Sequence, residues 1–262
     1  MNVNLNGKNA IVCGSTQGIG KAVAMVLAEL GATIILVARN EEKLQKTKLE
    51  LATPFTQKHD YICADFSKPD ELKLKIHSFL KDRAPMHILV NNTGGPPGGA
   101  IAEAETEAFE KTFSQHLICN HILAQAVLPG MKKENYGRIV NIISTSVKQP
   151  LKNLGVSNTV RAAVANWAKT LSVEVAPFGI TVNNVLPGAT LTARLNSLIE
   201  SRSKQTGRSV DELRREMLAE IPAGRFGDPA EIAHAVAFLA SPAAAYINGI
   251  NLPVDGGRTG SL

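Results

Sequence analysis

The sequence predicts an α/β fold, in which a doubly wound parallel sheet of a single domain carries helices on both faces. Short runs rich in β-branched residues alternate with longer amphipathic stretches from one end of the chain to the other. The strand candidates are almost continuously apolar, as strands buried on both faces are. A glycine-rich turn joins the first strand to the first helix. A length of 262 residues suits one such domain, predicted to span 1–262.

Each element is predicted from its hydrophobic periodicity and flanking turn residues. The strands are expected at 10–13, 33–37, 61–63, 88–90, 139–143, 181–185 and 250–254. The helices are expected at 19–30, 41–51, 69–81, 107–131, 158–176 and 229–239. Ligands of doubly wound sheets bind at the carboxyl ends of the strands, so motifs that follow strands are expected to meet at one site. The polar, helix-prone segment at about 190–224 interrupts the alternation and is predicted to be a lid over that site.

Composition excludes several classes of function. The net charge is +5, but the lysines are spread among acidic residues and aromatics make up only 5%, which indicates solvated helix surfaces rather than a nucleic-acid interface. No apolar run approaches the roughly 18 residues that span a bilayer, so we expect a cytoplasmic protein without membrane contact. Cys13, Cys63 and Cys119 lie far apart in apolar surroundings, which predicts buried reduced thiols and no metal site.

The glycine-rich turn is the strongest local signal for a ligand. It joins a predicted strand to a predicted helix, and its candidate contact residues are Gly14, Ser15, Thr16, Gly18, Ile19 and Gly20. Glycine permits positive φ and close approach of the backbone to a pyrophosphate, and the helix start favours negative charge. The turn therefore predicts a dinucleotide site in a Rossmann-like fold, with a purely structural turn as the alternative.

The spacing of this turn, together with later motifs, resembles the short-chain dehydrogenase/reductase family, and among its members the 3-oxoacyl-acyl-carrier-protein reductases. The later motifs follow in the family's order: Asp65, Asn91-Asn92-Thr93-Gly94, Ser144, Pro187-Gly188, Gly224-Arg225-Phe226-Gly227-Asp228-Pro229 and Val254-Asp255-Gly256-Gly257. The match covers nearly the whole chain.

This resemblance implies roles for residues at the matching positions. Asp65 would lie at the adenine, and Asn91 would hold cofactor and sheet together, with Gly94 in the same motif. Thr190 and Thr192 would contact the nicotinamide half of the cofactor, and Pro187 and Gly188 would also belong to the cofactor site. The alternative for each of them is an ordinary strand-end or turn residue.

Arg39 decides between the two nicotinamide cofactors. An acidic residue at the end of the second strand would accept hydrogen bonds from a ribose 2′-hydroxyl, but the sequence here reads Ala38-Arg39-Asn40. A guanidinium suits a 2′-phosphate, which a carboxylate would repel, so NADP(H) is predicted. Glu41 and Glu42 are explained by an N-cap at Asn40 and a first helical turn. The alternative is a solvated arginine.

The acid/base residues depart from the family. Ser144 stands at the family's serine position, but Ser157 replaces the tyrosine, Arg161 replaces the lysine and His116 replaces the relay asparagine. A serine hydroxyl is a much weaker acid than a phenol, and arginine does not donate a proton near neutral pH. Arg161 is expected to hold ribose hydroxyls and polarise a substrate oxygen, while His116 titrates in a useful range. Lys148 and Lys152 are further candidate donors.

The alternatives for the replaced residues are a helix cap for Ser157, a surface arginine for Arg161 and a core or surface histidine for His116.

Two functions remain open from the sequence. The first is an NADP(H)-dependent oxidoreductase that moves a hydride between nicotinamide and a small carbonyl or alcohol substrate, free or carrier-linked, with an atypical proton donor. The second is an NADP(H)-binding protein without turnover, a sensor or partner subunit. The resemblance also implies a homo-oligomer, a dimer or tetramer, through helices 107–131 and 158–176 and through the C-terminal segment.

Overall fold

Residues 1–261, which the structure describes, form a seven-stranded parallel sheet in a computed structural model. The strand order is β3-β2-β1-β4-β5-β6-β7. The strands are β1 (Asn9–Cys13), β2 (Thr33–Ala38), β3 (Asp60–Cys63), β4 (Ile88–Asn91), β5 (Gly137–Ile142), β6 (Ile180–Pro187) and β7 (Asn251–Val254). The order reverses between β1 and β4, which places the expected ligand crevice at the carboxyl ends of these two strands.

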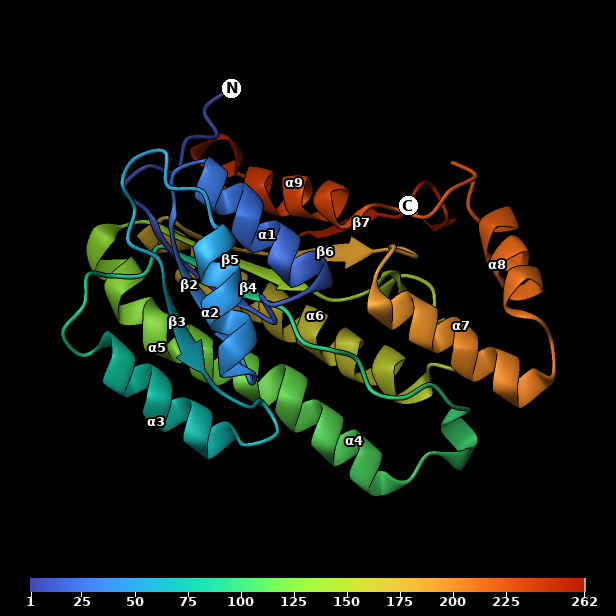
Figure 1. Cartoon of the computed structure of the whole chain (residues 1–262). Coiled ribbons are helices and arrows are strands. Elements are labelled where there is room, and N and C mark those ends of the chain that lie inside the picture. The colour runs from blue at the N-terminus through green and yellow to red at the C-terminus, as the bar shows by residue number, and fades with distance from the viewer. Residues whose placement is uncertain (262) are drawn as a thin grey trace.

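Helices cover both faces of the sheet (Figure 1). The helices are α1 (Gly18–Glu29), α2 (Glu41–Glu50), α3 (Pro69–Leu80), α4 (Thr106–Phe113), α5 (Cys119–Glu134), α6 (Gly155–Val175), α7 (Ala193–Thr206), α8 (Val210–Ala219) and α9 (Pro229–Ala240). Helices α1, α2 and α9 pack on one face, and α3, α5 and α6 pack on the other. The doubly wound sheet predicted from the sequence is confirmed.

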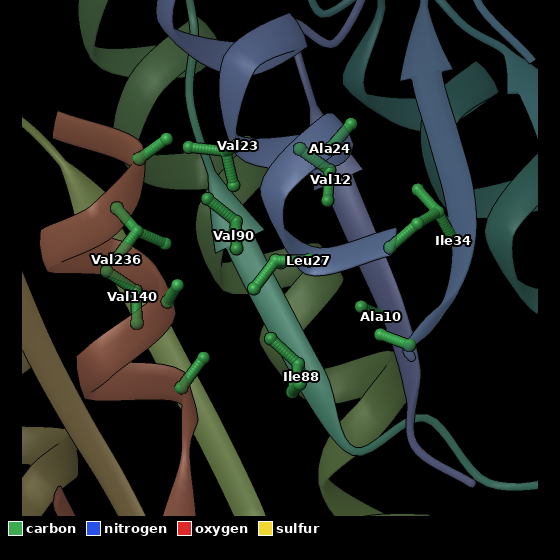
Figure 2. Close-up of a cluster of buried hydrophobic side chains, with 14 of the residues drawn as sticks. Ala10, Val12, Val23, Ala24, Leu27, Ile34, Ile88, Val90, Val140 and Val236 are labelled. Carbon is green, nitrogen blue, oxygen red and sulfur yellow. The ribbon is translucent and has the colours of Figure 1, made fainter. Parts of the chain in front are cut away.

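The core explains why this arrangement holds. On the first face Val23 and Leu27 of α1 and Val236 of α9 lie over Val90 and Val140 of the sheet, all buried (Figure 2). Burying side chains of this size contributes about 1.5–3 kcal/mol each. Because both faces are covered, the strands are apolar throughout, as predicted.

Two predictions about helices were wrong. The helix expected to run without interruption over 107–131 is divided into α4 and α5 by a π-helical turn at Ser114–Ile118. Such turns insert a residue into the helical repeat, a change that hydrophobic periodicity does not reveal. Helix α6 begins at Gly155 rather than at 158, so Ser157 lies inside its first turn and is not an N-cap.

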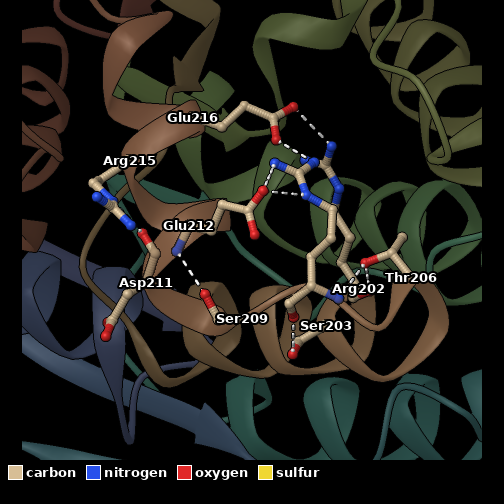
Figure 3. A network of polar contacts seen from close by, with 9 residues as sticks. Arg202, Ser203, Thr206, Ser209, Asp211, Glu212, Arg215 and Glu216 are labelled. Atoms are coloured by element: carbon tan, nitrogen blue, oxygen red, sulfur yellow. Dashed lines mark hydrogen bonds and ion pairs between the residues drawn. The ribbon is translucent and has the colours of Figure 1, made fainter.

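The segment predicted as a lid forms α7 and α8, which stand beside the carboxyl ends of the strands (Figure 1). Ion pairs join the two helices: Glu216 of α8 contacts Arg202 at 2.9 Å and Arg208 at 2.7 Å, and Arg208 also pairs with Glu212 (Figure 3). Leu195, Ile199 and Leu213 form a small core of their own. That the 190–224 segment closes over a ligand as a lid stays a prediction.

Among residues 1–261 no helix is long and apolar enough to cross a membrane. Cys13 and Cys119 are buried free thiols, as predicted, whereas Cys63 is half-buried. Burial raises the pKa of Cys119 to about 12.

Candidate functional site

The glycine turn forms a cradle too narrow for side chains. Gly14 and Gly18 have φ of +60° and +54°, the left-handed region that favours glycine. A Cβ built on Gly20 would lie 2.2 Å from the carbonyl oxygen of Gly14 and 2.6 Å from Nδ2 of Asn92. The turn therefore depends on the absence of side chains at these positions.

The start of α1 leaves backbone donors for a ligand. Its N-cap residue, Gln17, makes no side-chain capping bond, so the first N–H groups of the helix remain to be satisfied. Ser15 is fully buried and its Oγ donates to the carbonyl oxygen of Val37 at 3.4 Å, while Thr16 and Ile19 are half-buried. Free N–H groups and the helix dipole together favour a phosphate at this position.

Arg39 and Asp65 lie at the carboxyl ends of the neighbouring strands β2 and β3. Arg39 is exposed, and its charge contributes to lowering the pKa of Asp65. The larger cause of that lowered pKa is the backbone N–H of Ser67, which donates to Oδ1 of Asp65 at 2.9 Å. Asn40 caps α2 by accepting from the N–H of Lys43 at 2.8 Å, and Glu41 and Glu42 lie in the first turn of that helix, as predicted. Arg39, just before the cap, faces solvent.

The turn after β6 brings the start of α7 over the glycine cradle. Thr192 caps α7 by accepting from the N–H of Leu195, and its Cγ2 lies 3.3 Å from the position of a Cβ on Gly18. Thr190 is buried and donates to the carbonyl oxygen of Gly188 at 3.1 Å. Pro187, the last residue of β6, and Gly188 are half-buried beside them. The structure thus joins the two turns that the sequence separates by about 170 positions.

Asn91 begins a chain of side-chain amides across four strands. Its Nδ2 donates to Oδ1 of Asn141 at 2.9 Å, Asn141 donates to Asn184 at 2.9 Å, and Asn184 donates to Asn251 at 2.8 Å. These residues are in register from β4 to β7. Oδ1 of Asn91 is buried without a partner. Sequence reasoning found only Asn91, although asparagine at matching positions of strands β5 and β6 was a readable signal.

Ser144 and Ser157 lie at the carboxyl end of β5 and in the first turn of α6. Ser144 Oγ accepts from the N–H of Ser146 at 3.1 Å, and both serines are half-buried. Lys148 is half-buried in the loop that follows Ser144, and Lys152 is exposed.

Arg161 is buried, so the alternative of a surface arginine is wrong. Its side chain is 8% exposed and donates to the carbonyl oxygens of Ile142 at 2.9 Å and Thr93 at 3.3 Å. Burial, and then the charge of Arg194, lowers its pKa to about 10, which leaves it a cation at neutral pH. Arg161 therefore places a fixed positive charge at the ends of β4 and β5.

His116 does not titrate in the range expected from the sequence. Its side chain is 1% exposed, and Nδ1 lies 2.5 Å from Oγ1 of Thr93. Burial, followed by the charge of Arg161, lowers its pKa to about 2, so the imidazole is neutral. Nε2 is buried without a partner. The π-helical turn carries His116 inward at this point.

Arg194, on α7, was not singled out as a site residue in the sequence. It reaches across to the loop after β4 and donates to the carbonyl oxygen of Pro96. Gly94 is exposed, and a Cβ built on it would have nothing within 4 Å, whereas a Cβ on Gly95 would lie 3.5 Å from Arg194 and 4.0 Å from Arg161. Because this contact joins segments 98 residues apart, only the fold reveals it.

Among the described residues no cluster of histidine, cysteine or acidic side chains could hold a metal ion. The arrangement offers a phosphate cradle at β1, a guanidinium at β2, and two hydroxyls, a buried cation and a neutral imidazole around the ends of β4 and β5. These groups suit an extended anionic nucleotide whose far end meets a polarising charge.

The sequence also matches known proteins. Residues 14–259 match the family model for enoyl-(acyl carrier protein) reductase. The chain is 37% identical to the 3-oxoacyl-[acyl-carrier-protein] reductase FabG of Vibrio cholerae over 257 residues, which is 97% of this chain and 98% of that protein.

Two solved structures are similar throughout. The L-sorbose reductase of Gluconobacter frateurii, complexed with NADPH and L-sorbose, has a TM-score of 0.92 at 31% identity, with 100% of both chains covered. An actinorhodin polyketide ketoreductase with NADPH has a TM-score of 0.88 at 32% identity, covering 97% of this chain and 98% of that one.

Proposed function

The chain belongs to the short-chain dehydrogenase/reductase family, and from this premise we propose that it is an NADP(H)-dependent oxidoreductase acting on carbonyl and alcohol groups. The observation that carries the proposal is the glycine cradle. A Cβ on Gly14 or Gly20 would collide with backbone carbonyl oxygens, and Gly18 has a positive φ. A turn kept that open at an uncapped helix start fits a pyrophosphate.

The cofactor would lie along the carboxyl ends of the strands. The cradle would hold its pyrophosphate, Asp65 its adenine, and Thr190 and Thr192 its nicotinamide half. When bound, the nicotinamide supplies or accepts the hydride. Both similar structures described above contain NADPH.

Arg39 is proposed to select the phosphorylated cofactor, because a guanidinium makes paired hydrogen bonds to a phosphate. The test is to titrate Arg39→Ala with NADPH and with NADH by calorimetry. NADPH affinity should fall much more than NADH affinity, and equal losses would refute the role. Lys46→Ala, which removes an exposed charge from α2, is the matched control and should leave both affinities unchanged.

The proton chemistry is proposed to be atypical. Ser144 and Ser157 would orient the substrate oxygen, and Arg161 would stabilise the negative charge that develops on it. Since the buried His116 is neutral, it would position Thr93 rather than exchange a proton. Ser157 would then pass a proton from solvent to the oxygen.

Loss of the tyrosine and lysine favours a second candidate, an NADP(H)-binding protein without turnover, because a positioned general acid contributes about 10²–10⁴ in rate. Purified protein should be mixed with NADPH and a carbonyl panel, beside the triple variant Ser157→Tyr, Arg161→Lys, His116→Asn. NADPH oxidation by the unaltered chain supports the reductase. Oxidation by the variant alone supports the second candidate.

We further propose a cytoplasmic homo-oligomer, a dimer or tetramer, with a small-molecule or carrier-linked substrate. Exposed apolar side chains lie on the face of the sheet that α5 and α6 cover, among them Ile118, next to α5, and Val173, on α6. They support self-association. Sedimentation as a single 27.9 kDa species would contradict it.

A further inference from the structure

Two arginines approach Gly95 from different helices. Arg161 lies on α6 and Arg194 lies on α7. A Cβ built on Gly95 would lie 3.5 Å from Nη2 of Arg194 and 4.0 Å from Nη2 of Arg161. Both guanidinium groups therefore lie close to the same point of the backbone, and so to each other.

In the described part of the chain, neither guanidinium has an acidic partner. Within residues 1–261, neither arginine takes part in any ion pair with a carboxylate. Arg161 donates hydrogen bonds to the carbonyl oxygens of Ile142 and Thr93. Arg194 donates to the carbonyl oxygen of Pro96. The neighbouring imidazole of His116 is neutral and adds no negative charge. Buried charges are normally paired, and two neighbouring cations repel each other. An anion bound by both would offset both costs.

Two other arginines of the 190–224 segment show the contrast. Arg202 pairs with Glu216 across to α8, and Arg208, just beyond the end of α7, pairs with Glu212 and Glu216. Carboxylates of α8 therefore neutralise these two arginines, whereas Arg194 has no carboxylate partner among residues 1–261.

We propose that Arg161, besides stabilising charge on the reacting oxygen, joins Arg194 in binding a carboxylate of the substrate next to Gly95, so that the preferred substrates are oxo acids or hydroxy acids. The inference rests on the proposed function, since it names the substrate class of the same site. A carboxylate can accept hydrogen bonds from both guanidiniums. Because Arg194 belongs to α7, such binding would also draw this segment toward the loop after β4.

The phosphates of the dinucleotide are the other source of negative charge. The cradle that suits them lies at the end of β1 and is approached by Thr192. The arginine pair lies beyond it, at the ends of β4 and β5, where Ser144 and Ser157 would hold the reacting oxygen. This position favours the substrate over the cofactor.

The experiment compares acetoacetate with methyl acetoacetate, which share a skeleton and differ in charge. Thermal unfolding is followed at constant ionic strength, with and without saturating NADP⁺. Acetoacetate should raise the unfolding midpoint by about 3–5 °C at ten times its Kd, whereas the ester should not. The shift should persist with NADP⁺ bound. If NADP⁺ abolishes it, the arginines serve the cofactor's phosphates and the proposal is overturned.

Variants assign the shift to the two arginines. Arg194→Leu and Gly95→Val should abolish it, the first by removing a charge and the second by placing methyl groups against both guanidiniums, and Arg194→Lys should restore part of it. Lys204→Leu, which removes an exposed charge from the same helix, should leave it intact. A shift of equal size in Arg194→Leu would mean an adventitious ion only. NADPH stabilisation in the same samples separates failure of this inference from failure of the proposed function.

Discussion

His116→Asn should flatten the pH dependence of stability. In the folded chain burial lowers the pKa of His116 to about 2, whereas an unperturbed histidine titrates near 6.5. Between these values the unfolded chain binds a proton that the folded chain does not. Stability from this residue is therefore fully present above about pH 6.5 and is lost as the pH falls toward the folded value.

The magnitude follows from proton linkage. Between pH 6 and pH 5 the unfolded imidazole is mostly protonated and the folded one is not, so acidification should remove about 1.2 kcal/mol of unfolding free energy through this residue alone. The asparagine variant lacks this contribution. Burial also lowers the pKa of His59 and His87, and these residues contribute equally to both proteins.

Urea unfolding at pH 6 and pH 5 measures the difference directly. The change in unfolding free energy between the two pH values should be about 1.2 kcal/mol smaller in His116→Asn than in the unaltered chain. His121→Asn, the same substitution on an exposed side chain of α5, is the matched control and should behave as the unaltered chain does. Identical pH dependence in His116→Asn and the unaltered chain would refute the neutral, buried assignment.

Two further predictions follow from contacts in the site. Gly20→Ala should weaken NADPH binding more than tenfold in calorimetry. The new Cβ would overlap the carbonyl oxygen of Gly14 at 2.2 Å, and this overlap outweighs the ~1 kcal/mol that alanine contributes in a helix. Gly94→Ala, whose Cβ would have nothing within 4 Å, should leave the melting temperature unchanged. Asn141→Ala should lower the free energy of unfolding in urea by about 1–3 kcal/mol for each of its two orphaned amide partners, and a loss below about 1 kcal/mol in total would contradict the role of the amide chain.

Local patterns were enough to predict the sheet. Strand apolarity, glycine turns and caps such as Asn40 are set by near neighbours, so β1 to β7 were all located within a few residues. The π-helical turn at Ser114–Ile118 was missed because a single inserted residue hardly changes the periodicity. The start of α6 was missed because Leu154, its N-cap, makes no capping bond.

The candidate site was predictable only in part. Residues after strands were placed correctly at one edge, because parallel strands share that edge. The environments of those residues were not predictable: Arg161 and His116 owe their burial to the loop after β4 and to the π-helical turn. Arg194 was missed because its partner, Pro96, is distant in sequence.

The row of amides from Asn91 to Asn251 has a practical consequence for redesign. It fastens four strands together at one level, next to the crevice. Remodelling of the loop at 94–99 or of α7 and α8 would therefore take place on a rigid base, and libraries confined to those segments should alter substrate choice while preserving the scaffold.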